Sequence, residues 1–198
     1  DYYGINLAYG TREGLKHLIE EAHVFGIKVI SDWPAQPVSV RSHLVREHLE
    51  WFREINASTV SVNLNQPEIS DYITECMVYW VKEYDLDGFR LKSDEPAQFL
   101  GAARKALLAQ KPNFIIISDQ KIDHSNFDFI TSADLYENLK SVSKGEADAS
   151  ILNQCFANPT SGRQLNFIEE PQSKANPALE PASLPAIVLL LSGEGIPL

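Results

Sequence analysis

The chain has 198 residues, of which 44% are apolar and 22% are charged, as in an ordinary globular domain with a core of its own. Its formal net charge of −10 argues against a nucleic-acid partner, because such binding usually requires a basic surface. No run of about 18 uninterrupted apolar residues occurs, so the sequence predicts no membrane span.

Short apolar runs alternate with amphipathic helices along the chain, which is typical of a parallel α/β sheet or barrel. Thr11 is expected to cap a helix that runs to about Phe25 and ends at Gly26. Pro67 is expected to open a helix that runs to about Tyr84, because proline suits the first helical turn. Further helices are expected near 43–52, 96–110, 132–143, 147–157 and 181–191. Strands are expected at 27–31, 86–91, 113–118, 127–131 and 164–169, and one more begins at Gly195.

Several segments, taken together and in order, carry a recognisable pattern. They are DYYGINLAYGT (1–11), GIKVISDWPAQPVS (26–39), EHLEWF (47–52), VNLNQPEISDYI (62–73), YWVKEYDLDGFRLKSDEP (79–96), FIIISD (114–119), LNFIEEPQ (165–172) and SGEGIPL (192–198). This series resembles the strands and signatures of the alpha-amylase superfamily of glycoside hydrolases. The resemblance implies a parallel (β/α)8 barrel of the TIM-barrel type.

The expected barrel is incomplete. By the resemblance, residues 1–198 are expected to form one partial barrel domain of about six strands, in which the first two strands are missing and the eighth is cut short. A full barrel takes about 250 residues. Residues 37–66 are expected to be an irregular excursion after the third barrel strand, apart from the short helix near 43–52. The open strand edges that remain would suit a protein partner.

The resemblance also locates the positions where the family performs its chemistry. Retaining glycosidases use two carboxyl groups about 5–5.5 Å apart, one as nucleophile and one as acid and base. The nucleophile position here is Lys92, the acid/base position is Asp119, and the position of the stabilising aspartate is Gln172. An ammonium group cannot form a glycosyl ester and would repel a developing oxocarbenium ion. Lys92 and Asp119 are hypothesised to form an ion pair in place of the lost carboxylates.

Four residues are candidates for contact with substrate: Arg90, Asp32, Trp33 and Glu170. Arg90 fills the family's arginine position, and Glu170 occupies the fourth signature. Asp32 is either a ligand or a structural acceptor at a strand end, and Trp33 either stacks on a sugar ring or packs in the core. Asp85 and Asp87 flank a turn and are expected to be exposed to solvent.

No metal or other cofactor is expected. The family's usual calcium site takes an asparagine and an aspartate, and these positions are Gln36 and Ser61 here. Calcium prefers several hard oxygen ligands, often carboxylates, so the site is expected to be lost. Cys76 and Cys155 match no metal or redox spacing and are expected to be buried thiols.

The sequence therefore predicts an alpha-amylase-like domain that is catalytically inactive and binds an alpha-glucan such as a maltooligosaccharide, or serves as a scaffold. The alternative is an active alpha-glucan hydrolase or transglycosylase whose nucleophile has been relocated. The candidates for that nucleophile lie after two of the strands: Asp94, Glu95, Glu169 and Glu170. A third alternative is a decayed coding segment that does not fold well.

Overall fold

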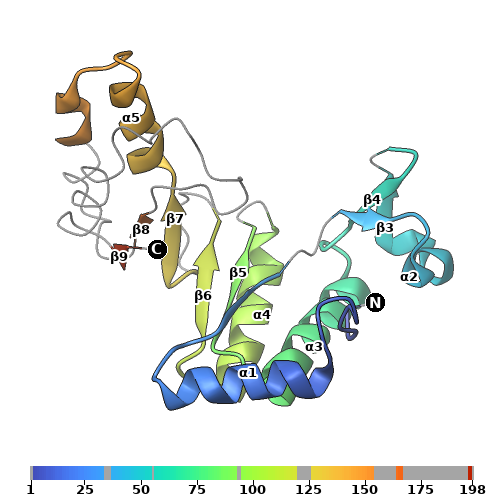
Figure 1. Ribbon diagram of the computed structural model, residues 1–198. Coiled ribbons are helices and arrows are strands. Elements are labelled where there is room, and N and C mark those ends of the chain that lie inside the picture. The colour runs from blue at the N-terminus through green and yellow to red at the C-terminus, as the bar shows by residue number, and fades with distance from the viewer. Residues whose placement is uncertain are drawn as a thin grey trace. The chain divides into compact units, whose positions relative to one another are not determined.

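The computed structural model describes residues 2–33, 37–54, 56–92, 95–119, 126–153, 164–166 and 196–197 (Figure 1). The chain divides into two compact units, Asp1–Ile116 and Ile117–Leu198. The expected succession of parallel strands and helices is confirmed in both units. Within the described residues, no helix is both long enough and apolar enough to cross a membrane.

The first unit is built on parallel strands that alternate with helices. Its strands follow one another in the sheet in the order β1 (Ile30–Asp32), β5 (Gly88–Leu91) and β6 (Ile115–Ser118), the last of which ends in the second unit. Its long helices are α1 (Arg12–Val24), α3 (Pro67–Tyr84) and α4 (Ala97–Gln110). Helices α3 and α4 pack against each other, as Figure 1 shows.

The helix ends follow the signals in the sequence. The Thr11 side chain accepts a hydrogen bond from the amide of Gly14 at 3.1 Å and so caps α1. Gly26, just beyond the helix, has a φ of +71°, which glycine adopts without strain. Pro67 begins α3, and Asp85 ends it in the left-handed region with a φ of 55°. The expected boundaries are thus confirmed to within a residue or two.

The core of this unit lies between β5 and the inner face of α3. Phe89 is fully buried, and Ile69, Ile73 and Met77 of α3 are fully buried as well. Gly88 is the first residue of β5, and no residue with a side chain fits at this position. A Cβ at this position would lie 2.4 Å from the carbonyl oxygen of Ile115. The glycine therefore lets neighbouring strands approach closely.

Residues 37–66 contain more regular structure than their sequence predicts. The helix expected near 43–52 is present as α2 (His43–Glu47) and the 3-10 helix η1 (Leu49–Trp51). The rest is not irregular, because β2 (Val38–Ser39), β4 (Thr59–Val62) and β3 (Phe52–Glu54) form an antiparallel sheet in that order. This small sheet and α2 lie together in Figure 1.

Two local signals explain this sheet. Val60 and Val62 are buried while Thr59 and Ser61 are not, which is the period-two alternation of a strand with one covered face. The Asn56 side-chain oxygen accepts hydrogen bonds from the amides of Ser58 and Thr59, both at 2.9 Å. An asparagine turn of this kind reverses the chain between β3 and β4.

The second unit continues the parallel pattern. The end of β6 pairs with β7 (Phe129–Ser132), β7 pairs with β8 (Gln164–Asn166), and β8 pairs with β9 (Ile196–Pro197). Helix α5 (Asp134–Ser143) and the 3-10 helix η2 (Ala149–Ile151) follow β7. The strands expected near 127–131, 164–169 and Gly195 are confirmed in position. The helix expected at 181–191 lies outside the described residues.

Candidate functional site

The carboxyl ends of β1 and β5 bring two of the predicted site residues together. Asp32 and Arg90 are direct partners in the parallel register of the two strands. The Arg90 Nε donates to Oδ1 of Asp32 at 2.6 Å, and Nη2 donates to Oδ2 at 2.7 Å. The Trp33 amide adds a backbone bond to the Arg90 carbonyl at 2.9 Å. This arrangement matches the planar fork of a guanidinium to both oxygens of a carboxylate.

The ion pair defines what Asp32 and Arg90 can do. The Arg90 side chain is 20% exposed and the Asp32 side chain is 62% exposed, so solvent reaches the pair mainly from the carboxylate side. Both Asp32 oxygens are engaged by the arginine. This contact is that of a structural acceptor at the end of β1, one of the two alternatives for Asp32, and its exposed carboxylate leaves the ligand alternative a prediction.

Lys92 follows the last residue of β5 and is partly exposed. Because side chains alternate along a strand, Lys92 is expected on the same face as Arg90, with buried Leu91 on the opposite face. Among the described residues of the first unit, Lys92 makes no ion pair. At this end of β1 and β5, Asp32 is the one acidic side chain that the structure describes in an ion pair. Its partner is Arg90.

Trp33 is only 8% exposed and contacts aromatic rings on two sides. Its ring stacks on Tyr2 with centroids 6.0 Å apart and meets the edge of Phe89 at 5.2 Å. Its indole Nε1 is buried and has no hydrogen-bond partner among the described residues. A sugar ring needs an open aromatic face, so this placement favours the packing alternative over the predicted sugar contact.

A buried carboxylic acid lies close to this aromatic group. Glu95 follows β5 and is 7% exposed, which is unusual for a glutamate. Burial raises the pKa of Tyr2 well above its usual range, and repulsion from the ionised forms of Cys76, Tyr72 and Glu95 raises it further. The Glu95 carboxylate is thus within electrostatic range of the Tyr2 hydroxyl. Its burial does not favour Glu95 as a nucleophile that must reach a sugar.

The remaining predicted site residues are distributed between the second unit and the undescribed part of the chain. Asp119 follows β6 directly in the second unit and is partly buried. Lys92 belongs to the first unit, so the Lys92–Asp119 ion pair stays a prediction. Ser61 lies in β4 opposite Arg53 of β3. The other positions named from the sequence lie outside the described residues: Gln36, Asp94, Cys155, Glu169, Glu170 and Gln172.

The expectation that Asp87 is exposed to solvent was wrong. Asp87 is 4% exposed and stands at the amino end of β5, opposite the end that carries Arg90. Its carboxylate accepts hydrogen bonds from the Val29 amide and from His23 Nε2, each at 2.8 Å. Lys111 Nζ lies 2.9 Å from its other oxygen. Asp85, in contrast, is exposed as expected and shares Lys111.

These partners decide the charge state of Asp87. Burial by itself would raise its pKa, but the Lys111 ammonium, the Val29 amide and His23 together lower it to about 2. The network joins α1, the residues just before β1 and β5, and the residue after α4. Residues at the amino ends of barrel strands usually serve stability. No spacing in the sequence singles out this network, because its members are far apart along the chain.

The known proteins that are similar to this chain include cyclomaltodextrinases, alpha-amylases and 1,4-alpha-glucan branching enzymes. The cyclomaltodextrinase of Geobacillus thermopakistaniensis is 28% identical over 148 residues, covering 60% of this chain and 25% of its own. A noncanonic maltogenic alpha-amylase from Thermotoga neapolitana matches the whole chain with a TM-score of 0.87 at 28% identity, over 51% of its own length. The alpha-amylase of Geobacillus thermoleovorans, solved in complex with acarbose, gives a TM-score of 0.83 at 20% identity, over 54% of its length.

These matches concern only part of each relative. The chain spans about a quarter of the length of the curated relatives and about half of the solved chains that it matches. No protein-family model matches the chain. The fold comparison confirms the predicted α/β class, and the sequence relatives confirm the resemblance that the signature segments carry.

Proposed function

We propose that this chain, whose relatives and structural neighbours are of the alpha-amylase superfamily, is an alpha-glucan-binding domain that does not cleave its ligand. The observation that carries the proposal is Lys92, which stands two residues after Arg90 at the carboxyl end of β5. The family signature has a nucleophilic carboxylate at that position. A lysine there can donate hydrogen bonds to sugar hydroxyls, but it cannot form the covalent glycosyl ester of a retaining mechanism.

The charges around Lys92 support this proposal. Arg90 and Lys92 carry two positive charges, and Asp32 already neutralises the first of them through both of its oxygens. An oxocarbenium-like transition state needs negative charge beside the anomeric carbon. A neutral glucan in its ground state has no such requirement. The complex of a structural neighbour with acarbose supports an alpha-glucan as the class of ligand.

The experiment combines a binding measurement and a turnover measurement on the same protein. Calorimetric titration with maltoheptaose should give saturable binding, and cellohexaose serves as the control because its linkages are β instead of α. Reducing-sugar release from maltoheptaose should stay at the level of a blank. Binding of neither sugar would contradict the proposal and leave a scaffold role.

The alternative is an active hydrolase or transglycosylase with a relocated nucleophile. The fourth signature segment favours it in one respect, because Glu169 and Glu170 are adjacent acids, and only one of two neighbours in a strand can face inward. Turnover of maltoheptaose that disappears in Glu170→Gln and survives in Glu169→Gln would establish this alternative and would overturn the proposal.

A further inference from the structure

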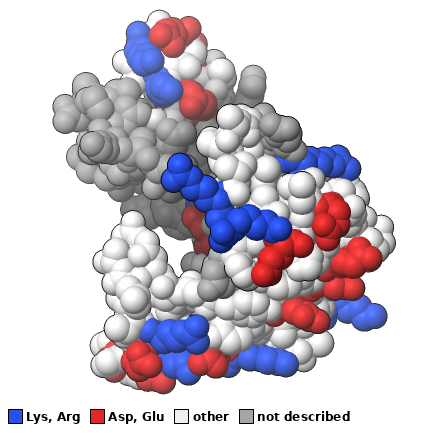
Figure 2. Space-filling model, turned by 90° about the vertical axis from the view of Figure 1, so that its right-hand side faces the viewer, with Lys and Arg blue, Asp and Glu red and all other residues white. Residues whose placement is uncertain are grey.

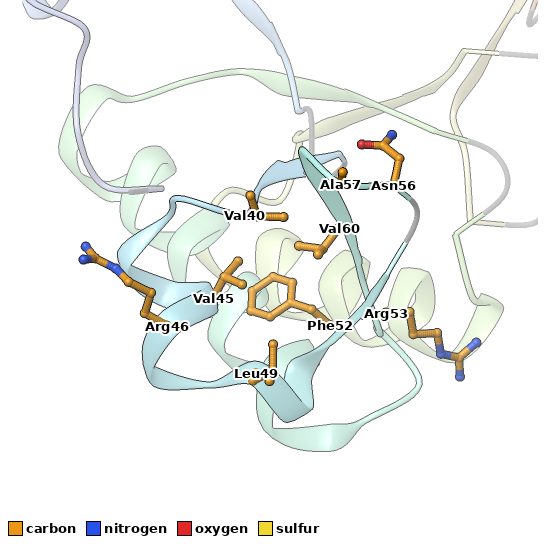
Figure 3. A pocket seen from close by; sticks show the side chains of 9 residues that line it. All are labelled: Val40, Val45, Arg46, Leu49, Phe52, Arg53, Asn56, Ala57 and Val60. Carbon is orange, nitrogen blue, oxygen red and sulfur yellow. The ribbon is translucent and has the colours of Figure 1, made fainter.

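A second concave site lies in the small sheet, away from the ends of β1 and β5. A pocket of about 390 Å³ opens between α2, η1 and the strands β3 and β4 (Figure 3). Its walls are mainly apolar, and Val45, Phe52 and Val60 at its base are each at most 9% exposed. Leu49 on its rim is 69% exposed. Pockets that bind specific groups usually have volumes of about 300–1,000 Å³.

The chemistry of this pocket does not suit a sugar. A sugar ring needs several hydrogen-bonding groups directed at its hydroxyls. The polar side chains among the lining residues are Arg46, Arg53 and Asn56. Figure 3 shows both guanidinium groups directed away from the centre, on opposite sides. The Asn56 oxygen is already engaged by the amides of Ser58 and Thr59. An apolar group is the occupant that the interior accepts.

The charge around the pocket restricts the occupant further. Arg46 and Arg53 are exposed, and among the described residues neither makes an ion pair. Two glutamates of the same segment are turned to histidines instead, Glu47 to His43 at 2.9 Å and Glu50 to His48 at 3.4 Å. In Figure 2, which looks onto this side of the molecule, Lys and Arg side chains lie beside Asp and Glu side chains.

The net charge of this segment differs strongly from that of the rest of the sequence. Residues 37–66 hold three arginines, three glutamates and no lysine or aspartate, so the whole net charge of −10 comes from outside them. A pocket with an arginine on each of two sides, neither of them in an ion pair among the described residues, is complementary to an apolar group that carries negative charge on both of its flanks.

We propose that this pocket binds an acidic peptide segment of a partner protein through one large apolar side chain. The apolar side chain enters between Val45, Phe52 and Val60, and carboxylates on either side of it contact Arg46 and Arg53. The outward and opposite directions of the two guanidinium groups favour a peptide over a small carboxylic acid, because a single carboxylate reaches only one of them. The proposal is independent of glucan binding.

The test uses the complete chain and a fluorescently labelled peptide in which one phenylalanine lies between two pairs of glutamates. Fluorescence anisotropy should show saturable binding. The double variant Arg46→Glu and Arg53→Glu should weaken it by at least about tenfold, because two attractive contacts become repulsive. The matched control is Arg41→Glu, the same charge reversal on the same segment at a residue that does not line the pocket; its affinity should stay within about twofold.

Two further arms separate the apolar contact from the charge. Ala57 is exposed on the pocket wall, so Ala57→Trp should fill the opening without disturbing the core, and it should abolish binding with an unchanged thermal midpoint. A peptide with alanine in place of phenylalanine should bind at least about tenfold more weakly. Equal binding by a peptide with lysines in place of the glutamates, or equal loss in Arg41→Glu, would overturn the proposal. Displacement of the peptide by octanoate at equal concentration would also overturn it, since that marks a small-carboxylate site.

Discussion

Arg90 binds both carboxylate oxygens of Asp32 across the parallel pair β1–β5, at 2.6 Å from Nε and 2.7 Å from Nη2. The two residues are also direct neighbours in the strand register. The ion pair therefore closes the carboxyl end of this strand pair on the face where the family signature places its chemistry. At this end of the two strands, Lys92 has no ion-pair partner among the described residues of the first unit.

Replacement of Asp32 by asparagine should lower the free energy of unfolding by about 1 kcal/mol, because the pair is bidentate but its carboxylate is largely solvated. Urea unfolding followed by circular dichroism measures this change. Asp71→Asn, at an exposed position on α3, is the matched control and should change stability by less than about 0.5 kcal/mol. Equal effects of the two substitutions would contradict a structural role for the fork.

The Asp87 network should make stability depend on pH in a defined direction. The pKa of Asp87 falls from 3.8 to about 2 in the folded state. A lowered pKa in the folded state means that the stabilising contribution is complete above about pH 4 and is lost as the pH falls towards 2. Asp87→Asn should cost about 2 kcal/mol at pH 7, and this difference from the natural protein should shrink below pH 4.

Urea unfolding between pH 7 and pH 3 measures this difference. Asp85→Asn is the control, because Asp85 contacts the same Lys111 but its side chain is 68% exposed. It should cost less at pH 7, since an exposed pair contributes little. A difference between the natural protein and Asp87→Asn that stays constant down to pH 3 would show that the carboxylate charge is not what stabilises this end of the fold.

Substitution by alanine should have opposite effects on stability at Gly88 and at Gly14, because only Gly88 lies in a close contact between strands. In Gly88→Ala the new Cβ would meet the Ile115 carbonyl oxygen at 2.4 Å and the Ile30 Cδ1 at 2.6 Å, so the strands must separate. The loss should be at least about 2 kcal/mol. In Gly14→Ala the nearest atom is Thr11 Oγ1 at 3.4 Å, and the helix should gain up to about 1 kcal/mol. Thermal unfolding of both variants checks the sign of each change.

A substitution of Trp33 distinguishes a packing role of its ring from a stacking contact with a sugar. Trp33→Leu removes the aromatic ring but keeps an apolar side chain between Tyr2 and Phe89. Since the ring is buried, the variant should lose about 2 kcal/mol of stability while its affinity for maltoheptaose changes by less than about twofold. A large loss of affinity at unchanged stability would reverse this assignment and make Trp33 a direct sugar contact.

The parallel strands and long helices could be predicted from the sequence because each carries its own local signal. Thr11, Gly26 and Pro67 mark helix ends by backbone chemistry that does not depend on distant residues. The small antiparallel sheet was missed although Thr59 to Val62 alternate in burial. Its strands have two to four residues, and in so short a run the alternation cannot be separated from loop sequence.

The site was predictable in part for a similar reason. The positions of Arg90 and Asp32 follow from signature segments, and the parallel register then makes them neighbours. The burial of Asp87 could not be foreseen, because it depends on His23 and Lys111, which only the folded chain brings together. The packing of Trp33 likewise requires Tyr2, which is far from it in the sequence.

Lys92→Asp restores the acidic side chain that the family signature has at the end of β5, and it tests how far the loss of chemistry extends. We expect no hydrolysis of maltoheptaose by this variant, because Asp119 is one methylene shorter than the family's glutamate and Gln172 cannot replace a carboxylate. The triple variant Lys92→Asp, Asp119→Glu and Gln172→Asp is the matched comparison, since it restores all three acidic positions. Release of reducing sugar, measured with the proteins at equal concentration and equal folded fraction, distinguishes the outcomes. Turnover by the single variant would mean that one ammonium group alone prevents catalysis, whereas turnover by the triple variant only would mean that the three positions were lost as a unit.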